Sequence, residues 1–322
     1  MKLALYLPLL LLAGCQPHLP LAADRAPMPD AADVESGEPG EPLVIPSLDD
    51  PDTVEVGSWN LQWFGDPQRG PSDDALQADN AAAVLAGLDL DLVGLSEVVS
   101  PDAFDDLIDR LPGYGGLLVT DPEVVGGVDS YWSGEQKVAL IHRDRFEVSA
   151  ARVILADHSW DFAGRPPLEV ELHFQEDGEP RTLVVIVTHF KAMANAYGYE
   201  RRRAAAEALH AYLEEVYRHR WVLVIGDLND DIDESTYDGE ESPFASLVDS
   251  PYYRFTTDSL TLAGVSTTTH FASTIDHHLA TDELAWRFVE GSAQVVRADE
   301  FVAGYPQTTS DHYPVVTRYD LR

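Results

Sequence analysis

The chain has 322 residues and 45% of them are hydrophobic, which is ample for a sizeable core near the upper size of one domain. Its 56 acidic and 21 basic residues give a formal net charge of −35. Because such a field repels polyanions, a surface built to grip long nucleic acid is disfavoured. A bound divalent cation can offset the charge locally, and solubility or adaptation to salt explains the acidity better than a binding role.

Residues 1–15 have the features of an export signal. After a basic start, residues 3–12 form an apolar run that is too short to cross a bilayer. The next residues, 12–15, read Leu-Ala-Gly-Cys and resemble the bacterial lipoprotein box, which implies lipidation of Cys15. Gln16 after the cysteine implies, by the same resemblance, the outer membrane of a Gram-negative cell. The alternative is an ordinary signal peptide in which the cysteine occurs by chance.

Residues 16–52 are predicted to be a disordered acidic tether that holds the domain away from the membrane. This segment is rich in proline, alanine, glycine and acidic residues. Its few apolar side chains cannot offset the entropy lost on ordering. The folded domain is therefore expected over residues 53–322. Cys15 is the only cysteine of the sequence, so no disulfide supports this domain.

From residue 54 onward, apolar runs that predict strands are mixed with segments of helical spacing. A hairpin turn is predicted at Asp177-Gly178. This order of elements indicates a mixed α/β domain with two packed sheets. The strands are expected at residues 54–61, 92–98, 137–142, 146–155, 168–174, 183–188, 221–225, 275–280 and 314–319, and the helices at residues 74–88, 101–111 and 200–218.

Polar residues stand at the tips of several of these strands. Ionisable groups are costly inside a buried strand unless they are paired or bind a metal, whereas at a tip they can converge on a cleft. Carboxylate and amide oxygens suit a hard cation, and imidazole suits proton transfer. Taken singly, each residue is more simply a turn former, a surface acid, a loop cap or a satisfied core histidine. The residues are Asn60, Glu97, His189, Asp227, Asn229, Asp276, Asp311 and His312.

Taken together and in this order, the motifs resemble the endonuclease/exonuclease/phosphatase superfamily, which includes deoxyribonuclease I-like enzymes. The resemblance covers about residues 54–321 and implies a four-layer α/β/β/α sandwich with the active site at one edge. His189 resembles a histidine of the deoxyribonuclease and sphingomyelinase branch. The motifs are Trp59-Asn60, Glu97-Val98, Gly226-Asp227-Leu228-Asn229, Ile275-Asp276 and Ser310-Asp311-His312-Tyr313-Pro314.

The resemblance implies a metal ion and a set of residues that hold it. Glu97 matches the metal-binding glutamate of the family, and Asn60 supports metal and phosphate beside it. Asp311 matches a further contact to metal or phosphate. Mg²⁺ is the expected cofactor because it prefers oxygen ligands and keeps several waters, with Mn²⁺ and Ca²⁺ as alternatives. Whether one or two ions bind stays open.

The remaining matched residues carry the catalytic roles that the resemblance implies. Asp227 and Asn229 would orient the attacking water and hold the phosphate. His312 would be the catalytic histidine, with Asp276 fixing its tautomer and favouring its charged form. His189 would stabilise the charge that develops on phosphate or protonate the leaving oxygen.

Three further residues are candidates for substrate contacts or support. Glu135 is the candidate partner carboxylate of His189. Lys191 and Arg202 are placed where they could meet a phosphate, but the arginines of this region could equally pair with nearby acids. No segment interleaves aromatic and basic residues as single-strand binders do.

We therefore expect a metal-dependent phosphodiesterase, nuclease-like, anchored outside the cell and monomeric. The alternatives are a phosphomonoesterase or a phospholipid head-group phosphodiesterase of the same fold, or an inactive binding lipoprotein. The two histidines and the carboxylate behind one of them speak against the binding protein, because binding alone does not need them. The substrate is a phosphate ester, and the charge of −35 leaves nucleic acid unsettled as that substrate.

Overall fold

The structure is a computed structural model and describes residues 44–322. The predicted signal segment, Cys15 and residues 16–43 of the predicted tether lie outside the described residues. The first sheet has the order β11 (Gln294–Val295), β12 (Val315–Tyr319), β1 (Val54–Phe64), β2 (Leu92–Val98), β4 (Lys137–Arg143), β3 (Tyr114–Leu118). The second has the order β5 (Glu147–Val153), β6 (Leu168–Glu176), β7 (Glu179–His189), β8 (Val222–Asp227), β10 (Asp276–Thr281), β9 (Tyr253–Phe255).

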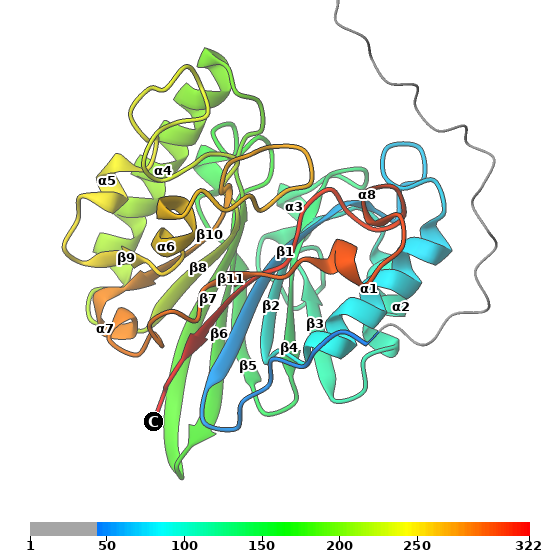
Figure 1. The fold of residues 1–322 in the computed structure, drawn as a ribbon. Coiled ribbons are helices and arrows are strands. Elements are labelled where there is room, and N and C mark those ends of the chain that lie inside the picture. The colour runs from blue at the N-terminus through cyan, green and yellow to red at the C-terminus, as the bar shows by residue number, and fades with distance from the viewer. Residues whose placement is uncertain (1–43) are drawn as a thin grey trace, which may run out of the picture. The chain divides into compact units, whose positions relative to one another are not determined.

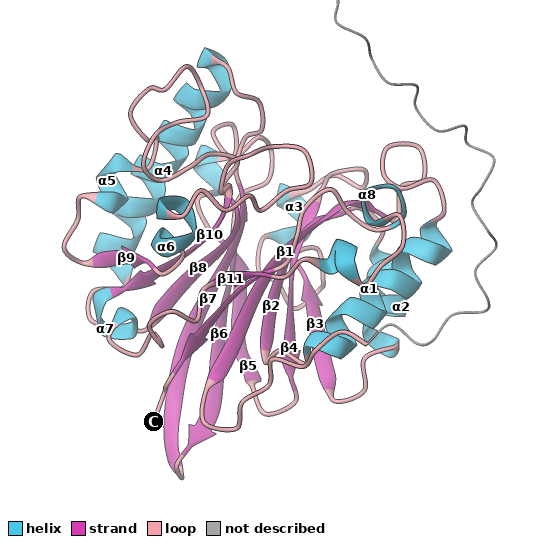
Figure 2. Cartoon of the chain, viewed as in Figure 1, coloured by secondary structure: helices cyan, strands magenta, loops and turns pink. Residues whose placement is uncertain are grey.

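The two sheets pack face to face, and helices cover their outer faces (Figures 1 and 2). One apolar cluster lies between the sheets, one joins the first sheet to α1 and α2, and one joins the second sheet to α4. These four layers confirm the predicted α/β/β/α sandwich. Within residues 44–322, no helix combines the length and the apolar character needed to cross a membrane. The helices are α1 (Asp74–Leu88), α2 (Pro101–Asp109), α3 (Gly127–Ser130), α4 (Ala196–Val216), α5 (Ala245–Val248), α6 (Asp258–Leu262), α7 (Asp282–Ala285) and α8 (Tyr305–Thr308).

Strand direction brings the predicted site residues to one edge of the sandwich. β1 runs parallel to β2, and Asn60 is registered with Ser96, one residue before Glu97. β7 runs parallel to β8, so that His189 is registered with Asp227. β10 is antiparallel to β8 and begins at Asp276, opposite the same Asp227. The strand ends that carry the predicted site residues therefore meet at this edge, although they belong to two sheets.

A polar contact fixes how the two sheets face one another. His278 on β10 is fully buried, and its Nε2 lies 3.0 Å from Oγ of Ser58 on β1. Its Nδ1 lies 2.7 Å from Oγ1 of Thr317 on β12. Because buried polar groups are costly without partners, these bonds favour one alignment of the sheets over others.

Residues 44–52 differ from the prediction of a disordered tether up to residue 52. Ile45 is 7% exposed and belongs to the apolar cluster under α1. The backbone N–H of Leu48 donates to the carbonyl of Leu88 over 2.9 Å, and Arg318 donates to the carbonyl of Leu48. A single buried isoleucine and two bonds are enough to attach the segment, so the predicted boundary is too late in the chain.

Ile45 is therefore expected to contribute to stability, in contrast to its neighbour Val44, which is 77% exposed. The Ile45→Ala variant should lose about 2 kcal/mol of unfolding free energy because a buried aliphatic side chain leaves a cavity. Val44→Ala should change it by less than about 0.5 kcal/mol. Urea unfolding of both variants measures the difference, and equal stabilities would show that the segment is not attached in solution.

Candidate functional site

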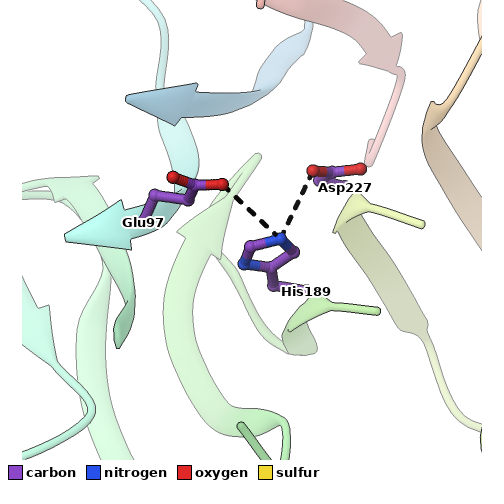
Figure 3. A group of neighbouring side chains, drawn as sticks. All are labelled: Glu97, His189 and Asp227. Carbon is purple, nitrogen blue, oxygen red and sulfur yellow. Dashed lines mark ion pairs between the residues drawn. The ribbon is translucent and has the colours of Figure 1, made fainter. Parts of the chain in front are cut away.

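Four side chains from the two sheets meet at the edge described above. The side-chain amide of Asn60 on β1 donates to Oε1 of Glu97 over 3.0 Å and to Oδ2 of Asp227 over 2.9 Å. Nε2 of His189 lies 3.5 Å from Oδ2 of Asp227 and 3.8 Å from Oε1 of Glu97. Figure 3 shows both carboxylates directed at the imidazole of His189 from opposite sides. The contacts of Asn60 and His189 thus bridge the two sheets.

A second group shares Asp227 with the first. Nδ1 of His312 lies 2.9 Å from Oδ2 of Asp276, and its Nε2 lies 3.8 Å from Oδ2 of Asp227. All three side chains are almost entirely buried. The carboxylate of Asp276 therefore fixes the orientation of the imidazole and directs Nε2 toward Asp227.

The backbone around the site adopts left-handed conformations that most residues avoid. Glu97 has φ 64° and Asn229 has φ 57°, although neither is glycine. Gly226 has φ 139°, and a Cβ there would lie 2.0 Å from the carbonyl oxygen of Thr188. Glycine is therefore required before Asp227 for β7 and β8 to pair as closely as they do. Such strain concentrates at functional sites, where the surrounding fold holds it in place.

The two histidines of the site have opposite electrostatic environments. Burial lowers the pKa of His189 well below its usual value, and the positive charges of Arg165 and His312 lower it further. Burial also opposes the charged form of His312, but the carboxylates of Asp276 and Asp227 outweigh it and hold the pKa of His312 well above its usual value. The surroundings of His312 thus favour its charged form, and those of His189 favour its neutral form. Paired groups with such separated pKa values are typical of acid–base sites.

Burial also raises the pKa values of the two carboxyl groups that meet at His189. For Glu97, the hydrogen bond from Asn60 and the charge of Arg165 oppose this effect only in part. For Asp227, the charge of His312 and the bond from Asn60 oppose it in part. Two buried carboxylates this close repel one another, and a cation between them would relieve the repulsion.

The donor set fits a hard divalent cation. One ligand atom each from Glu97, His189 and Asp227 lie within 4.8 Å of one another, and so do those of Asp227, Asp276 and His312. A backbone N–H from Trp63 donates to the second carboxylate oxygen of Glu97 over 3.0 Å and fixes its position. This cluster can bind a metal ion. The positive charge of a cation would favour the ionised form of its carboxyl groups and so counteract their raised pKa values.

The other predicted residues lie around this cluster. Asp311 is partly exposed, and its negative charge contributes to the raised pKa values of both Glu97 and His312. The backbone N–H of Asn229 donates to Oδ1 of Asp227 over 2.9 Å, and its side chain donates to the carbonyl of Phe190. Lys191 is half-buried, and its ammonium donates to the carbonyl of Ala192 over 3.1 Å.

Arg165 is a buried cation below the site that the sequence analysis did not find. It is 6% exposed, and its guanidinium donates to Gln136 and, over 3.0 Å, to the carbonyl of Phe190. Its charge acts on both Glu97 and His189. The signal that the sequence offered is the pair of prolines that follows Arg165 directly before β6. These prolines make the chain rigid where it enters the strand and so fix the position of Arg165.

Two predicted roles are corrected by the structure. Glu135 is not the partner of His189, because its carboxylate accepts a bond from Trp132 and Nδ1 of His189 has no hydrogen-bond partner among residues 44–322. Arg202 is fully buried and pairs with Asp230 over 2.7 Å, so it cannot meet a substrate. Its guanidinium also donates to the carbonyls of Lys191 and Met193. Arg202 therefore supports the loop that follows His189.

A pair of variants separates support from substrate contact. Arg202→Met should lose about 3–5 kcal/mol of unfolding free energy, because it leaves Asp230 buried without its cation. Arg203→Met is the control, since that side chain is 52% exposed and pairs with Glu200 at the surface. It should change stability by less than about 0.5 kcal/mol. Urea unfolding measures both, and an Arg202→Met variant of unchanged stability but raised KM would restore the substrate role.

Comparisons with known proteins address the fold and the family. Solved structures that match include an endonuclease/exonuclease/phosphatase from Bacteroides vulgatus, with TM-score 0.60, 20% identity, and coverage of 84% of this chain and 99% of that one. D. rerio TDP2 complexed with a single-strand DNA product has TM-score 0.57, 14% identity, and coverage of 83% and 98%. A mannosyl-6-phosphatase from Bacteroides thetaiotaomicron has TM-score 0.53, 16% identity, and coverage of 82% and 98%.

These likenesses concern the fold alone, since their identities are low. The search of curated proteins gave no match. The model of the endonuclease/exonuclease/phosphatase family matches residues 57–312, a range that begins on β1 and ends at His312. This match includes nearly the whole sandwich and every residue of the two groups that share Asp227, and the chain belongs to the endonuclease/exonuclease/phosphatase family.

Proposed function

We propose that this protein is a Mg²⁺-dependent phosphodiesterase that hydrolyses its substrate at the edge where the two sheets meet. The observation that carries the proposal is the position of Asp227 between two histidines, with Oδ2 lying 3.5 Å from Nε2 of His189 and 3.8 Å from Nε2 of His312. A binding protein would need neither this arrangement nor the carboxylate of Asp276 behind His312. The acidic surface favours small or already exposed phosphate esters over long duplexes.

The residues divide the reaction between them. Asp227 orients the attacking water and accepts its proton as the new bond to phosphorus forms. His312, protonated and held by Asp276, donates a proton to the leaving oxygen as the ester bond breaks. His189, neutral, donates a hydrogen bond to a phosphoryl oxygen. A cation held by Glu97, Asn60 and Asp311 would stabilise the charge on the phosphoryl oxygens.

We further propose that the protein is exported and lipid-anchored at Cys15, as the segment before it suggests. The course of the described chain is compatible with this arrangement. Leu48 bonds to Leu88, which precedes the start of β2, whereas Glu97 lies at the other end of that strand. A tether attached there would leave the catalytic edge free to face away from the membrane, where soluble substrates arrive.

The assay compares substrates that differ in class. With Mg²⁺ we expect turnover of bis-p-nitrophenyl phosphate, loss of that turnover with chelator, and little hydrolysis of p-nitrophenyl phosphate or sphingomyelin. His312→Ala should lower kcat by roughly 10²-fold or more because a general acid is removed. Faster hydrolysis of p-nitrophenyl phosphate than of the diester would favour the phosphomonoesterase. No turnover of any substrate, plasmid DNA included, would favour the binding lipoprotein, and a fully active His312→Ala would contradict the mechanism.

Asp276 should also affect how the reaction rate depends on pH. Asp276→Asn should lower kcat by about 10²-fold or more, since the imidazole loses both its orientation and its charge partner. Because a carboxylate raises the pKa of His312, its removal lowers that pKa, and the alkaline limb of the pH–rate profile should move to lower pH. Asp79→Asn, at an exposed position, is the control. An alkaline limb that does not move would show that Asp276 has no influence on the proton that His312 donates.

A further inference from the structure

The carboxylate of Asp276 makes a single hydrogen bond within residues 44–322. Its Oδ2 lies 2.9 Å from Nδ1 of His312, whereas its Oδ1 is buried and has no hydrogen-bond partner in that part of the chain. One bond restrains a carboxylate less than two bonds do. The position of this carboxylate against the imidazole therefore depends strongly on what holds the backbone of Asp276.

Asp276 stands on a part of β10 where threonine hydroxyls take the place of a neighbouring strand. β10 pairs with β8 from Asp276 onward, but with β9 only from Leu279 onward. Buried N–H groups on the β9 side of the earlier residues need other acceptors. Oγ1 of Thr257 accepts from the N–H of His278 over 3.3 Å, and Oγ1 of Thr267 accepts from the N–H of Asp276 over 3.3 Å.

Thr267 also connects this strand to the segment that carries His312. Its side chain is fully buried, and its Oγ1 accepts a second bond from the N–H of Ile275 over 3.1 Å. Its carbonyl accepts from the N–H of Tyr313, the residue after His312, over 2.8 Å. One residue thus binds beside both members of the Asp276–His312 pair, with its hydroxyl on one side and its carbonyl on the other.

The backbone of His312 is held independently of the Thr267 hydroxyl. Its N–H donates to Oγ of Ser310 over 3.0 Å, and its carbonyl accepts from Nε1 of Trp59 over 3.1 Å. The bond from Tyr313 to the Thr267 carbonyl does not involve the hydroxyl either. Loss of the hydroxyl would therefore loosen the strand end that carries the carboxylate while the imidazole stays in place.

We propose that Thr267 is a positioning residue, whose hydroxyl holds the backbone of Asp276 so that its carboxylate meets the imidazole of His312. This role rests on the proposed mechanism, in which His312 donates a proton to the leaving oxygen. Thr267 acts through Asp276 and needs no contact with the substrate. Its hydroxyl should therefore affect kcat and leave KM almost unchanged.

Three variants separate this role from general support of the fold. Thr267→Val removes the hydroxyl at similar volume, and Thr267→Ser keeps it. Thr257→Val is the matched control, because Thr257 is fully buried and serves the same strand two residues further from the site. Thr267→Ala removes the same hydroxyl and serves as the test if Thr267→Val does not fold.

The kinetic comparison uses bis-p-nitrophenyl phosphate and Mg²⁺. In Thr267→Val, kcat should fall by about 10-fold or more, because a small displacement of a reacting group is enough for such a loss. KM should stay within about 2-fold of its original value, since a contact that acts only in the transition state is weakened. Thr267→Ser and Thr257→Val should keep kcat within about 2-fold.

Proton NMR tests the same contact without turnover. The Nδ1 proton that His312 shares with the carboxylate of Asp276 should give a resonance far downfield, because a charge-assisted hydrogen bond strongly deshields its proton. Its disappearance in His312→Ala assigns the signal. The resonance should move upfield or be lost by exchange in Thr267→Val, and it should persist in Thr267→Ser and Thr257→Val.

Urea unfolding completes the comparison of the two valine variants. Both should be destabilised, because each leaves a buried N–H without its acceptor, yet only Thr267→Val should change kcat and the resonance. Unchanged kcat and an unchanged resonance in Thr267→Val, or equal losses of both in Thr257→Val, would overturn the proposal. A resonance that responds to Thr267→Val in a protein without hydrolytic activity would support the positioning role and contradict the phosphodiesterase, so the two failures are distinguishable.

Discussion

Three contacts that assemble the site join one sheet to the other. Asn60 reaches Asp227, Glu97 meets His189, and His312, just before β12, binds Asp276 on β10. The spacing of the sheets is therefore the constraint on which the chemistry depends. Gly94 on β2 shows how tight it is, because a Cβ there would lie 2.6 Å from Cδ1 of Ile225 on β8. The polar contact of His278 with Ser58 and Thr317 then fixes the alignment of the two faces.

Sequence alone was sufficient for the features that depend on local pattern. The apolar runs before Asp227 and after His312 located β8 and β12, and Asp177-Gly178, both with positive φ, form the predicted hairpin turn. The layered fold followed from the order of elements, and the family from the order of motifs. The polar strand tips were found because a carboxylate or imidazole beside a buried strand contradicts the hydrophobic pattern, and such contradictions concentrate at functional sites.

Features that depend on packing between distant segments were not predictable in this way. β3 was missed because Gly115 and Gly116 weaken its strand pattern. The role of Arg202 depends on Asp230, a buried partner that no local spacing identifies. Trp160 meets Tyr197 of α4 from a separate segment, a contact that no single segment of the sequence reveals. The attachment of Ile45 likewise depends on a surface that only the folded helix α1 provides.

The strand order also has a consequence for synthesis. The second sheet is built from one continuous stretch between β5 and β10, whereas the first sheet needs β12 to pair with β1. Ser310, two residues before His312, bonds to the carbonyl of Asn60 across 250 residues of chain. A growing chain can complete the second sheet and still hold Asp227 and Asp276 without the imidazole of His312. Hydrolytic competence should consequently appear in one late step, when β12 closes onto β1, and a nascent chain would carry no partial activity.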